Sequence, residues 1–254
     1  MIKIVSKRCD LVKVHTTVGK VLGTLIIGMV FGCSGAEESS PEVQDEGLGT
    51  LTGVIRLSGD RVTTPTIVEN STDPEVCGER HSLQDLVVGS GRGIRYVIVA
   101  LVDVPEDSFP QVVGEPLIID NRDCRFTPHV SVVTAGTVIE ATNSDPVLHT
   151  THLYGAMERN FALPTVGLRV SRVAEGEGMV IVKCDVHGWM QSFLRIDPHP
   201  FHAVTDAAGT FRINNIPPGE YTLEVWHERL GQTHRSIRIE SAQSTEISVS
   251  FDYR

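Results

Sequence analysis

The feature that most restricts this chain is a nine-residue stretch, Lys183-Cys184-Asp185-Val186-His187-Gly188-Trp189-Met190-Gln191. It places a thiol, an imidazole and a thioether at C-x2-H-x2-M spacing, directly after the apolar run 179–182. That run predicts a strand, so a strand end would deliver the cysteine and a tight turn would bring the other two side chains beside it. Soft and borderline donors without a carboxylate suit copper better than calcium or magnesium.

A copper site of this kind needs a second imidazole, and His149 offers one after the strand-like run 136–143. His129 and His152 are expected to be surface imidazoles or to lie around the site without binding the metal. The cysteine and methionine have a simpler interpretation, since both residue types commonly fill cores. The presence of all four donors, in order and at workable spacing, favours the metal site.

The run 136–143, the histidine after it and the C-x2-H-x2-M loop together resemble the cupredoxins, the blue-copper fold, and the loop spacing is amicyanin-like. The resemblance covers about residues 116–197. It implies a Greek-key β-sandwich with one mononuclear type 1-like copper. The ligands that it implies are His149, Cys184, His187 and Met190.

The same resemblance implies two further roles. Asn143 would join the two ligand loops from outside the ligand set. One edge of His187 would lie at the surface in an apolar patch with Trp189, Pro146 and Val147, and electrons would pass there. The Gly188-Trp189 pair departs from the proline and phenylalanine of the amicyanin loop, which leaves the loop's rigidity and the shape of its apolar rim open.

The C-terminal segment has a different pattern. An Asp206-x-x-Gly209 turn, a strand, a Pro-Pro-Gly turn at 217–219 and a second strand resemble the second half of carboxypeptidase regulatory-like domains, which are transthyretin-like β-sandwiches. About four strands are too few to close a sandwich alone. Strands that could complete it lie at 52–57 and 97–101, before the copper-like segment.

We therefore predict an all-β chain with two sandwiches. Residues 50–105 and 203–254 would fold together as the carboxypeptidase regulatory-like domain, and residues 106–202 would form an inserted cupredoxin domain.

Residues 1–33 predict an export signal, because five basic side chains precede and flank a twelve-residue apolar run that is too short to span a bilayer stably. The run ends in Val30-Phe31-Gly32-Cys33, which resembles a bacterial lipoprotein signal and implies lipidation of Cys33. The alternative is an ordinary signal with an incidental cysteine. Residues 34–49 are acidic and poor in apolar side chains, so a disordered tether is expected. The expected location is the periplasmic side of the bacterial cell envelope, at the outer membrane.

The net charge of the chain limits the classes of binding partner that are expected. Removal of residues 1–33 takes away five basic side chains and one acidic one, so the formal charge changes from −10 to −14. Phosphate repulsion makes such a protein a poor nucleic-acid binder, whereas a basic redox partner protein or simple solubility would explain the acidic charge.

The remaining cysteines are Cys77 and Cys124. In an exported protein, they are expected to form a disulfide. Their Cα atoms must then lie within about 7 Å of each other.

The favoured function is one-electron transfer by a mononuclear copper. Enzymatic activity is not expected, because the four ligands leave no position for a substrate. The alternative is a non-redox envelope module that binds a polysaccharide or a partner protein, with a vestigial or copper-storing site.

Overall fold

The computed structural model describes residues 47–59, 64–109 and 113–252 of the chain, which belong to one compact unit, 44–254. Strands dominate these residues, and their only helical elements are one four-residue α-helix and two short 3-10 helices. The prediction of an all-β chain is confirmed. The predicted signal, Cys33 and the predicted tether, apart from its last residues, lie outside the described residues. No helix in the described ranges is long and apolar enough to cross a membrane.

Strands from both ends of the described chain build one β-sandwich, called here the outer sandwich. Its two sheets have the orders β15-β1-β18 and β14-β4-β16-β17. The strands are β1 (Gly49–Leu57), β4 (Ile98–Val102), β14 (His202–Val204), β15 (Thr210–Ile216), β16 (Gly219–His227), β17 (Gly231–Ile239) and β18 (Ser244–Phe251). Each sheet therefore combines one strand from the N-terminal part, β1 or β4, with strands from the C-terminal part.

The period-2 pattern of these strands explains their pairing. In β18, Val249 and Phe251 are buried whereas Ser248 and Ser250 are exposed, so one face of the sheet enters the core. Strand β1 lies between β15 and β18, and its residues Leu51 and Ile55 are fully buried in the same core cluster. Each sheet thus has one apolar face, and the two faces cover each other.

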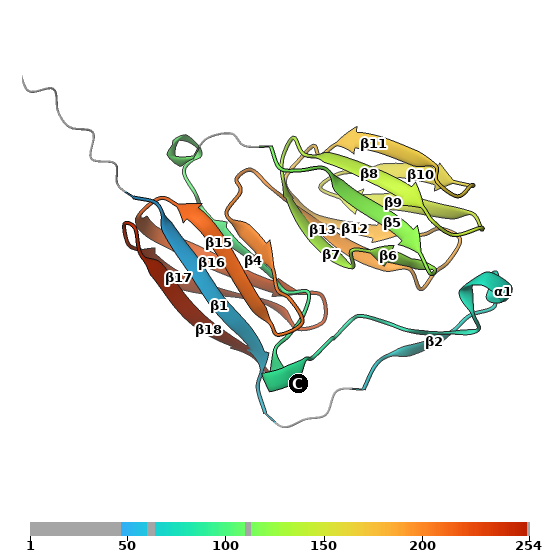
Figure 1. Ribbon diagram of the computed structural model, residues 1–254, viewed down its shortest axis with the longest axis horizontal. Helices are drawn as coiled ribbons and strands as arrows, with labels where there is room; N and C mark the ends of the chain where they lie inside the picture. The colour runs from blue at the N-terminus through green and yellow to red at the C-terminus, as the bar shows by residue number, and fades with distance from the viewer. Residues whose placement is uncertain (1–46, 60–63, 110–112, 253–254) are drawn as a thin grey trace, which may run out of the picture. The chain divides into compact units, whose positions relative to one another are not determined.

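Residues 117–197 form a second sandwich, called here the copper sandwich, which Figure 1 shows in green to orange. Its sheets have the orders β10-β9-β12-β13-β7 and β11-β8-β5-β6. The strands are β5 (Leu117–Arg122), β6 (Arg125–Thr127), β7 (Val130–Thr134), β8 (Val138–Asn143), β9 (His149–Gly155), β10 (Arg159–Leu163), β11 (Arg169–Val173), β12 (Gly178–Lys183) and β13 (Gln191–Asp197). The chain passes repeatedly between the two sheets, which closes a core around Phe126, Leu153 and Leu194.

Residues 64–85, called here the cap segment, belong to the sheets of neither sandwich. They contain β2 (Ile67–Glu69), α1 (Pro74–Cys77) and β3 (Arg80–Ser82), and β2 and β3 pair only with each other. The sequence assigns this segment to the outer sandwich, whereas its side chains contact the predicted metal ligand His187, as described below. The physical reason is that no apolar alternation ties it to either core.

Two 3-10 helices, η1 (Ser90–Arg92) and η2 (Glu106–Ser108), complete the described elements. The glycines on either side of η1, Gly89 and Gly93, lie against the carbonyls of Ala207 and Ala208, so closely that a Cβ atom would not fit. This glycine-rich stretch is therefore a packed connector of the outer sandwich.

Candidate metal centre

The predicted ligand loop is the connection between β12 and β13. Cys184 follows the end of β12, and its N–H donates to the carbonyl of Met190 with an N···O distance of 3.3 Å. The Met190 N–H donates to the carbonyl of His187 at 2.9 Å. These bonds fold the loop back on itself, and the Met190 side chain is buried in the same cluster as Cys184.

Three donor atoms converge at this end of the copper sandwich. His149 is the first residue of β9, the strand beside β12. Cys184 Sγ lies 3.8 Å from His149 Nδ1 and 3.7 Å from His187 Nδ1. Both histidines are 0 % exposed and Cys184 is 4 % exposed. The structure thus brings a thiol and two imidazoles to one buried point, where their ligand atoms lie within 4.8 Å of one another.

Thr150 joins the two ligand loops. Its backbone N–H points at Cys184 Sγ with an N···S distance of 3.4 Å, and its hydroxyl accepts the Asp185 N–H at 2.7 Å. The resemblance gave this joining role to Asn143. In the structure, the Asn143 amide instead donates to the carbonyls of Val147, at 2.9 Å, and Leu163, at 2.8 Å. Asn143 therefore organises the loop before His149 and its contact with β10.

Asp145 is a buried carboxylate that the sequence interpretation missed. One oxygen lies 3.0 Å from His149 Nε2 and also accepts the Cys124 N–H at 2.9 Å, and the other accepts the Asp123 N–H at 2.9 Å. A proton on Nε2, donated to this carboxylate, leaves the Nδ1 lone pair free to face the sulfur. Its spacing, four residues before the histidine, was a signal too weak to assign a role.

The charge state of His149 agrees with a ligand role. Burial lowers the pKa of His149, and the neighbouring His187 lowers it further, against the opposing effect of Asp145. A lowered pKa keeps the imidazole neutral at pH 7, and a neutral imidazole is the form that binds a metal.

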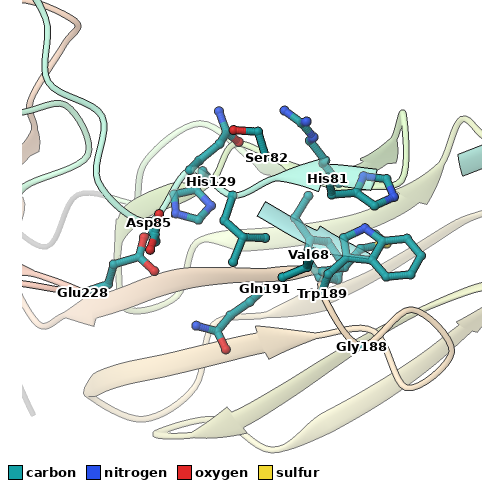
Figure 2. A pocket seen from close by; sticks show the side chains of 14 residues that line it. Val68, His81, Ser82, Asp85, His129, Gly188, Trp189, Gln191 and Glu228 are labelled. Carbon is teal, nitrogen blue, oxygen red and sulfur yellow. Dashed lines mark hydrogen bonds and ion pairs between the residues drawn. The ribbon is translucent and has the colours of Figure 1, made fainter. Parts of the chain in front are cut away.

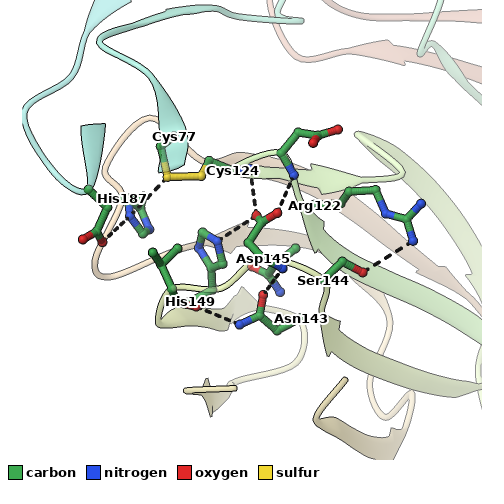
Figure 3. A network of polar contacts seen from close by, with 12 residues as sticks. Cys77, Arg122, Cys124, Asn143, Ser144, Asp145, His149 and His187 are labelled. Atoms are coloured by element: carbon green, nitrogen blue, oxygen red, sulfur yellow. Dashed lines mark hydrogen bonds and ion pairs between the residues drawn. A yellow bond between two sulfur atoms is a disulfide. The ribbon is translucent and has the colours of Figure 1, made fainter. Parts of the chain in front are cut away.

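His187 differs from the expectation. The predicted surface edge of this histidine is wrong for this chain, because the residue is 0 % exposed. Its Nε2 lies 3.1 Å from Asp73 Oδ2 and 3.7 Å from Cys77 Sγ, both in the cap segment. Figure 3 shows the disulfide beside the imidazole of His187. The cap segment covers the edge that the resemblance left open.

The structure places Cys77 and Cys124 in a disulfide, with their Cα atoms 5.4 Å apart. Asp123 and Cys124 both have positive φ, 53° and 50°, in the tight turn between β5 and β6. Such backbone favours asparagine or glycine, and here Asp145 accepts the N–H of both turn residues. One carboxylate therefore holds both the disulfide turn and a predicted copper ligand.

A cavity of about 260 Å³ lies beside the ligand loop. Figure 2 shows His81 and Trp189 on one side of it and His129 and Glu228 on the other. The His81 and Trp189 rings stack with centroids 4.3 Å apart, and Met190 also lines the cavity. Part of the cap segment thus borders this cavity, and the side chains that face the cavity are not packed against other residues there.

The other histidines of the copper sandwich do not join the donor atoms. His152 Nδ1 lies 2.9 Å from an Asp185 oxygen, and its side chain is 20 % exposed. His129 contacts the carboxylate of Glu228 through Nε2. Both therefore stay outside the group formed by His149, Cys184 and His187.

His227, in the outer sandwich, supports a prediction about pH and stability. Burial lowers its pKa to about 4, with a further lowering by His129. The unfolded chain binds this proton below about pH 6.5 and the folded chain does not until about pH 4, so stability falls as pH falls through that window. The contribution is on the order of 3 kcal/mol.

Replacing His227 with glutamine should therefore flatten the pH dependence of the unfolding free energy between pH 6.5 and pH 4, measured by urea denaturation. The exposed His234 serves as the control, and His234→Gln should keep the wild-type slope. An unchanged slope in His227→Gln would contradict the assignment.

Comparisons with known proteins give one family match and several similar structures. Residues 196–252 match the family model of the carboxypeptidase regulatory-like domain. The chain is also similar to a purple cupredoxin from Nitrosopumilus maritimus, with 23 % identity over 33 % of this chain and 100 % of that one, at a TM-score of 0.29. A reduced, Cu(I) form of an amicyanin variant has 16 % identity over 39 % of this chain and 98 % of that one, at a TM-score of 0.30.

A third similar structure is the copper-containing nitrite reductase from Thermus scotoductus SA-01. The identity is 21 % over 37 % of this chain, at a TM-score of 0.29, and only 26 % of the enzyme's chain is covered. No match is found among the curated proteins. Both resemblances drawn from the sequence, to cupredoxins and to carboxypeptidase regulatory-like domains, are found again in these comparisons.

The residues present fit a mononuclear copper. Cys184 is the free cysteine of the described residues, and both imidazoles face it with Nδ1. The Nε2 atoms face the carboxylates of Asp145 and Asp73. Both carboxylates therefore contact the imidazoles at the nitrogen that does not face the sulfur. Two imidazoles, a thiol and a nearby thioether are the donor types that blue-copper sites use.

Proposed function

We propose that this protein is a mononuclear copper protein that transfers single electrons. The observation that carries the proposal is the convergence of His149 Nδ1, His187 Nδ1 and Cys184 Sγ at a buried point. Copper, when bound there, would accept and return one electron between its two oxidation states. The geometry is already fixed by hydrogen bonds in the protein, and a site that needs little rearrangement suits electron transfer.

Each surrounding residue has a role in that proposal. Asp145 orients His149 and holds the proton on Nε2, which leaves Nδ1 as the ligand atom. The Thr150 N–H lies 3.4 Å from the sulfur, and hydrogen bonding to the cysteine sulfur tunes the potential of such sites. Met190, buried beside the loop, would supply a weakly bound thioether.

A carrier role is proposed over an enzymatic one. The donor atoms are buried, so a small molecule has no direct route to a coordination position. Electrons would instead leave through the protein to a redox partner, for which a chain of net charge −10 favours a basic surface.

The test is a copper titration of the full chain, followed by visible spectroscopy and a redox cycle. One equivalent of Cu(II) should produce an intense visible band that disappears on reduction and returns on oxidation. Zinc, which also binds cysteine and histidine, would give no such band. Binding of copper without the band or the cycle would favour the storage alternative, in which the covered His187 simply retains the metal.

We further propose that the chain is exported and anchored through a lipid on Cys33, on the periplasmic side of the outer membrane. The support is the basic, short apolar leader that ends at this cysteine. Wild-type protein should sediment with membranes, and Cys33→Ala should lose lipid-dependent processing. Recovery of all wild-type protein in the soluble fraction would contradict the anchor.

A further inference from the structure

We propose that the Cys77–Cys124 disulfide is a functional exchange site, reduced by a dithiol partner, and that its reduction uncovers His187. The inference rests on the proposed electron-transfer function and adds a regulated access route to the same site. Four observations carry it: the position of the disulfide, the sparse packing of the cap segment, the cavity beneath it, and the unequal exposure of the two sulfurs.

The disulfide lies directly on the ligand. Cys77 Sγ is 3.7 Å from His187 Nε2, and Asp73, four residues earlier, places a carboxylate 3.1 Å from the same nitrogen. The ring edge that points away from Cys184 is therefore covered by the cap segment. A partner that approaches this end of the copper sandwich meets α1 before it meets the imidazole.

Polar contacts hold the two ends of the cap segment, where Arg229 donates to Thr66 and Asp85 and Gln84 donates to Tyr96. Few contacts besides the disulfide and Asp73 hold its middle part down. Helix α1 has no buried residue, and Ile67 and Val76 are 48 % and 43 % exposed. Its two strands form a sheet of their own. His81 stacks on Trp189, but its Nε2 is buried without a hydrogen-bond partner among the described residues. An unpartnered buried nitrogen is costly, so this contact holds the segment weakly.

The cavity that the cap segment borders also indicates that this segment is sparsely packed. Residues 81–85 line the cavity of about 260 Å³ whose other walls include Phe126, Trp189 and Met190. Segments with few buried apolar contacts open locally at low free energy. The covalent bond to Cys124 is therefore the main restraint that keeps α1 over His187.

The two sulfurs differ in access. Cys124 is fully buried and Cys77 is only partly buried, so an incoming thiolate would attack Cys77. A mixed disulfide with Cys77 forms, and Cys124 leaves as a thiolate and takes up a proton. The second thiol of the partner, as its thiolate, then attacks the partner's own sulfur in the mixed disulfide, so Cys77 is released as a thiol and the partner becomes oxidised. Two electrons and two protons pass from the dithiol to the disulfide.

The first experiment asks whether the bond is a latch. Metal-free full-length protein is compared with the Cys77→Ser/Cys124→Ser double variant by hydrogen–deuterium exchange. Exchange in residues 67–83 should accelerate by about tenfold or more in the double variant, while β12 and β13 stay protected. Dithiothreitol added to the folded wild-type protein should free two additional thiols and give the same exchange pattern. Unchanged protection, or a bond that resists dithiothreitol until unfolding, would overturn the proposal.

The second experiment asks whether the latch controls access. The reduced, copper-loaded proteins are oxidised by hexacyanoferrate(III) in a stopped-flow instrument. The second-order rate constant should rise by about tenfold or more in the double variant. Val76→Ser, an exposed cap position with the disulfide intact, is the matched control and should react at the wild-type rate.

The outcomes separate the two proposals. An opened cap with an unchanged oxidation rate would overturn the access role and leave the copper site standing. Absence of any reversible copper oxidation in the wild type and in both variants would remove the proposed function, and this inference with it. If the double variant fails to fold, both measurements are made on wild-type protein treated with dithiothreitol. The reagent is removed under anaerobic conditions before the measurements.

Discussion

Replacing Cys184 with serine is expected to abolish the intense visible absorption of the copper-loaded protein. The thiolate is the electron donor in the charge-transfer transition, and a hydroxyl oxygen is a much weaker donor. Cys184 is buried and receives the Thr150 N–H on its sulfur, so the serine should fit without disturbing the sandwich. The measurement is the visible spectrum after addition of one equivalent of Cu(II), with circular dichroism to check folding.

Met190→Leu is the matched control for that experiment. A thioether is a weak ligand in blue-copper sites, so this variant should keep copper and the visible band while its reduction potential shifts. Leucine has nearly the same volume, and Met190 lies in the same core cluster as Cys184, so packing is preserved. If Cys184→Ser retains the parent spectrum, the ligand assignment is wrong.

The second large effect is expected at Asp145. In Asp145→Asn, an amide NH2 group can take the place of the carboxylate oxygen that faces His149 Nε2, and it would donate a hydrogen bond to that nitrogen. The imidazole would then carry its proton on Nδ1, the atom that faces the sulfur, and copper would have to displace it. Loss of such an outer partner typically lowers metal affinity by about 10–100-fold, which a competition titration with a chelator of known affinity measures.

Asp120→Asn provides a control of similar burial, 8 % against 7 % exposed. Asp120 accepts the Ser144 hydroxyl and pairs with Arg122 in the same region, and no described contact joins it to a ligand. The copper affinity of the Asp120→Asn variant should therefore stay within a few-fold of the wild-type affinity. Equal losses in the two variants would show that Asp145 acts through general destabilisation and not through His149.

Some of this site could be predicted because its signal is local. Cys184, His187 and Met190 lie within one loop, so C-x2-H-x2-M spacing and the preceding strand pattern are enough to suggest that they meet. His149 required a second strand pattern and a resemblance. The pairing of strands β1 and β4 with the C-terminal strands follows from counting, since four strands cannot cover both faces of a sandwich.

The rest depends on long-range contacts that no local pattern encodes. Asp73 lies 114 positions before His187 in the sequence, and an aspartate that precedes a proline reads as an ordinary helix or turn start. The Cys77–Cys124 pair can be proposed from cysteine counting, but its place against a ligand cannot. The expectation of an exposed His187 failed for this reason, because a family resemblance describes the shared sandwich and not a segment added by another part of the chain.

The parallel ladder between β1 and β18 has a mechanical consequence. It joins eight residue pairs, from Thr50 with Ser244 to Leu57 with Phe251, and so connects the first strand of the described residues to the last. Tension applied between the two ends would load this ladder in shear, with many hydrogen bonds sharing the force at once. The force would bypass residues 58–243, so a chain pulled from its N-terminus would transmit the load without stretching the loops that position the donor atoms.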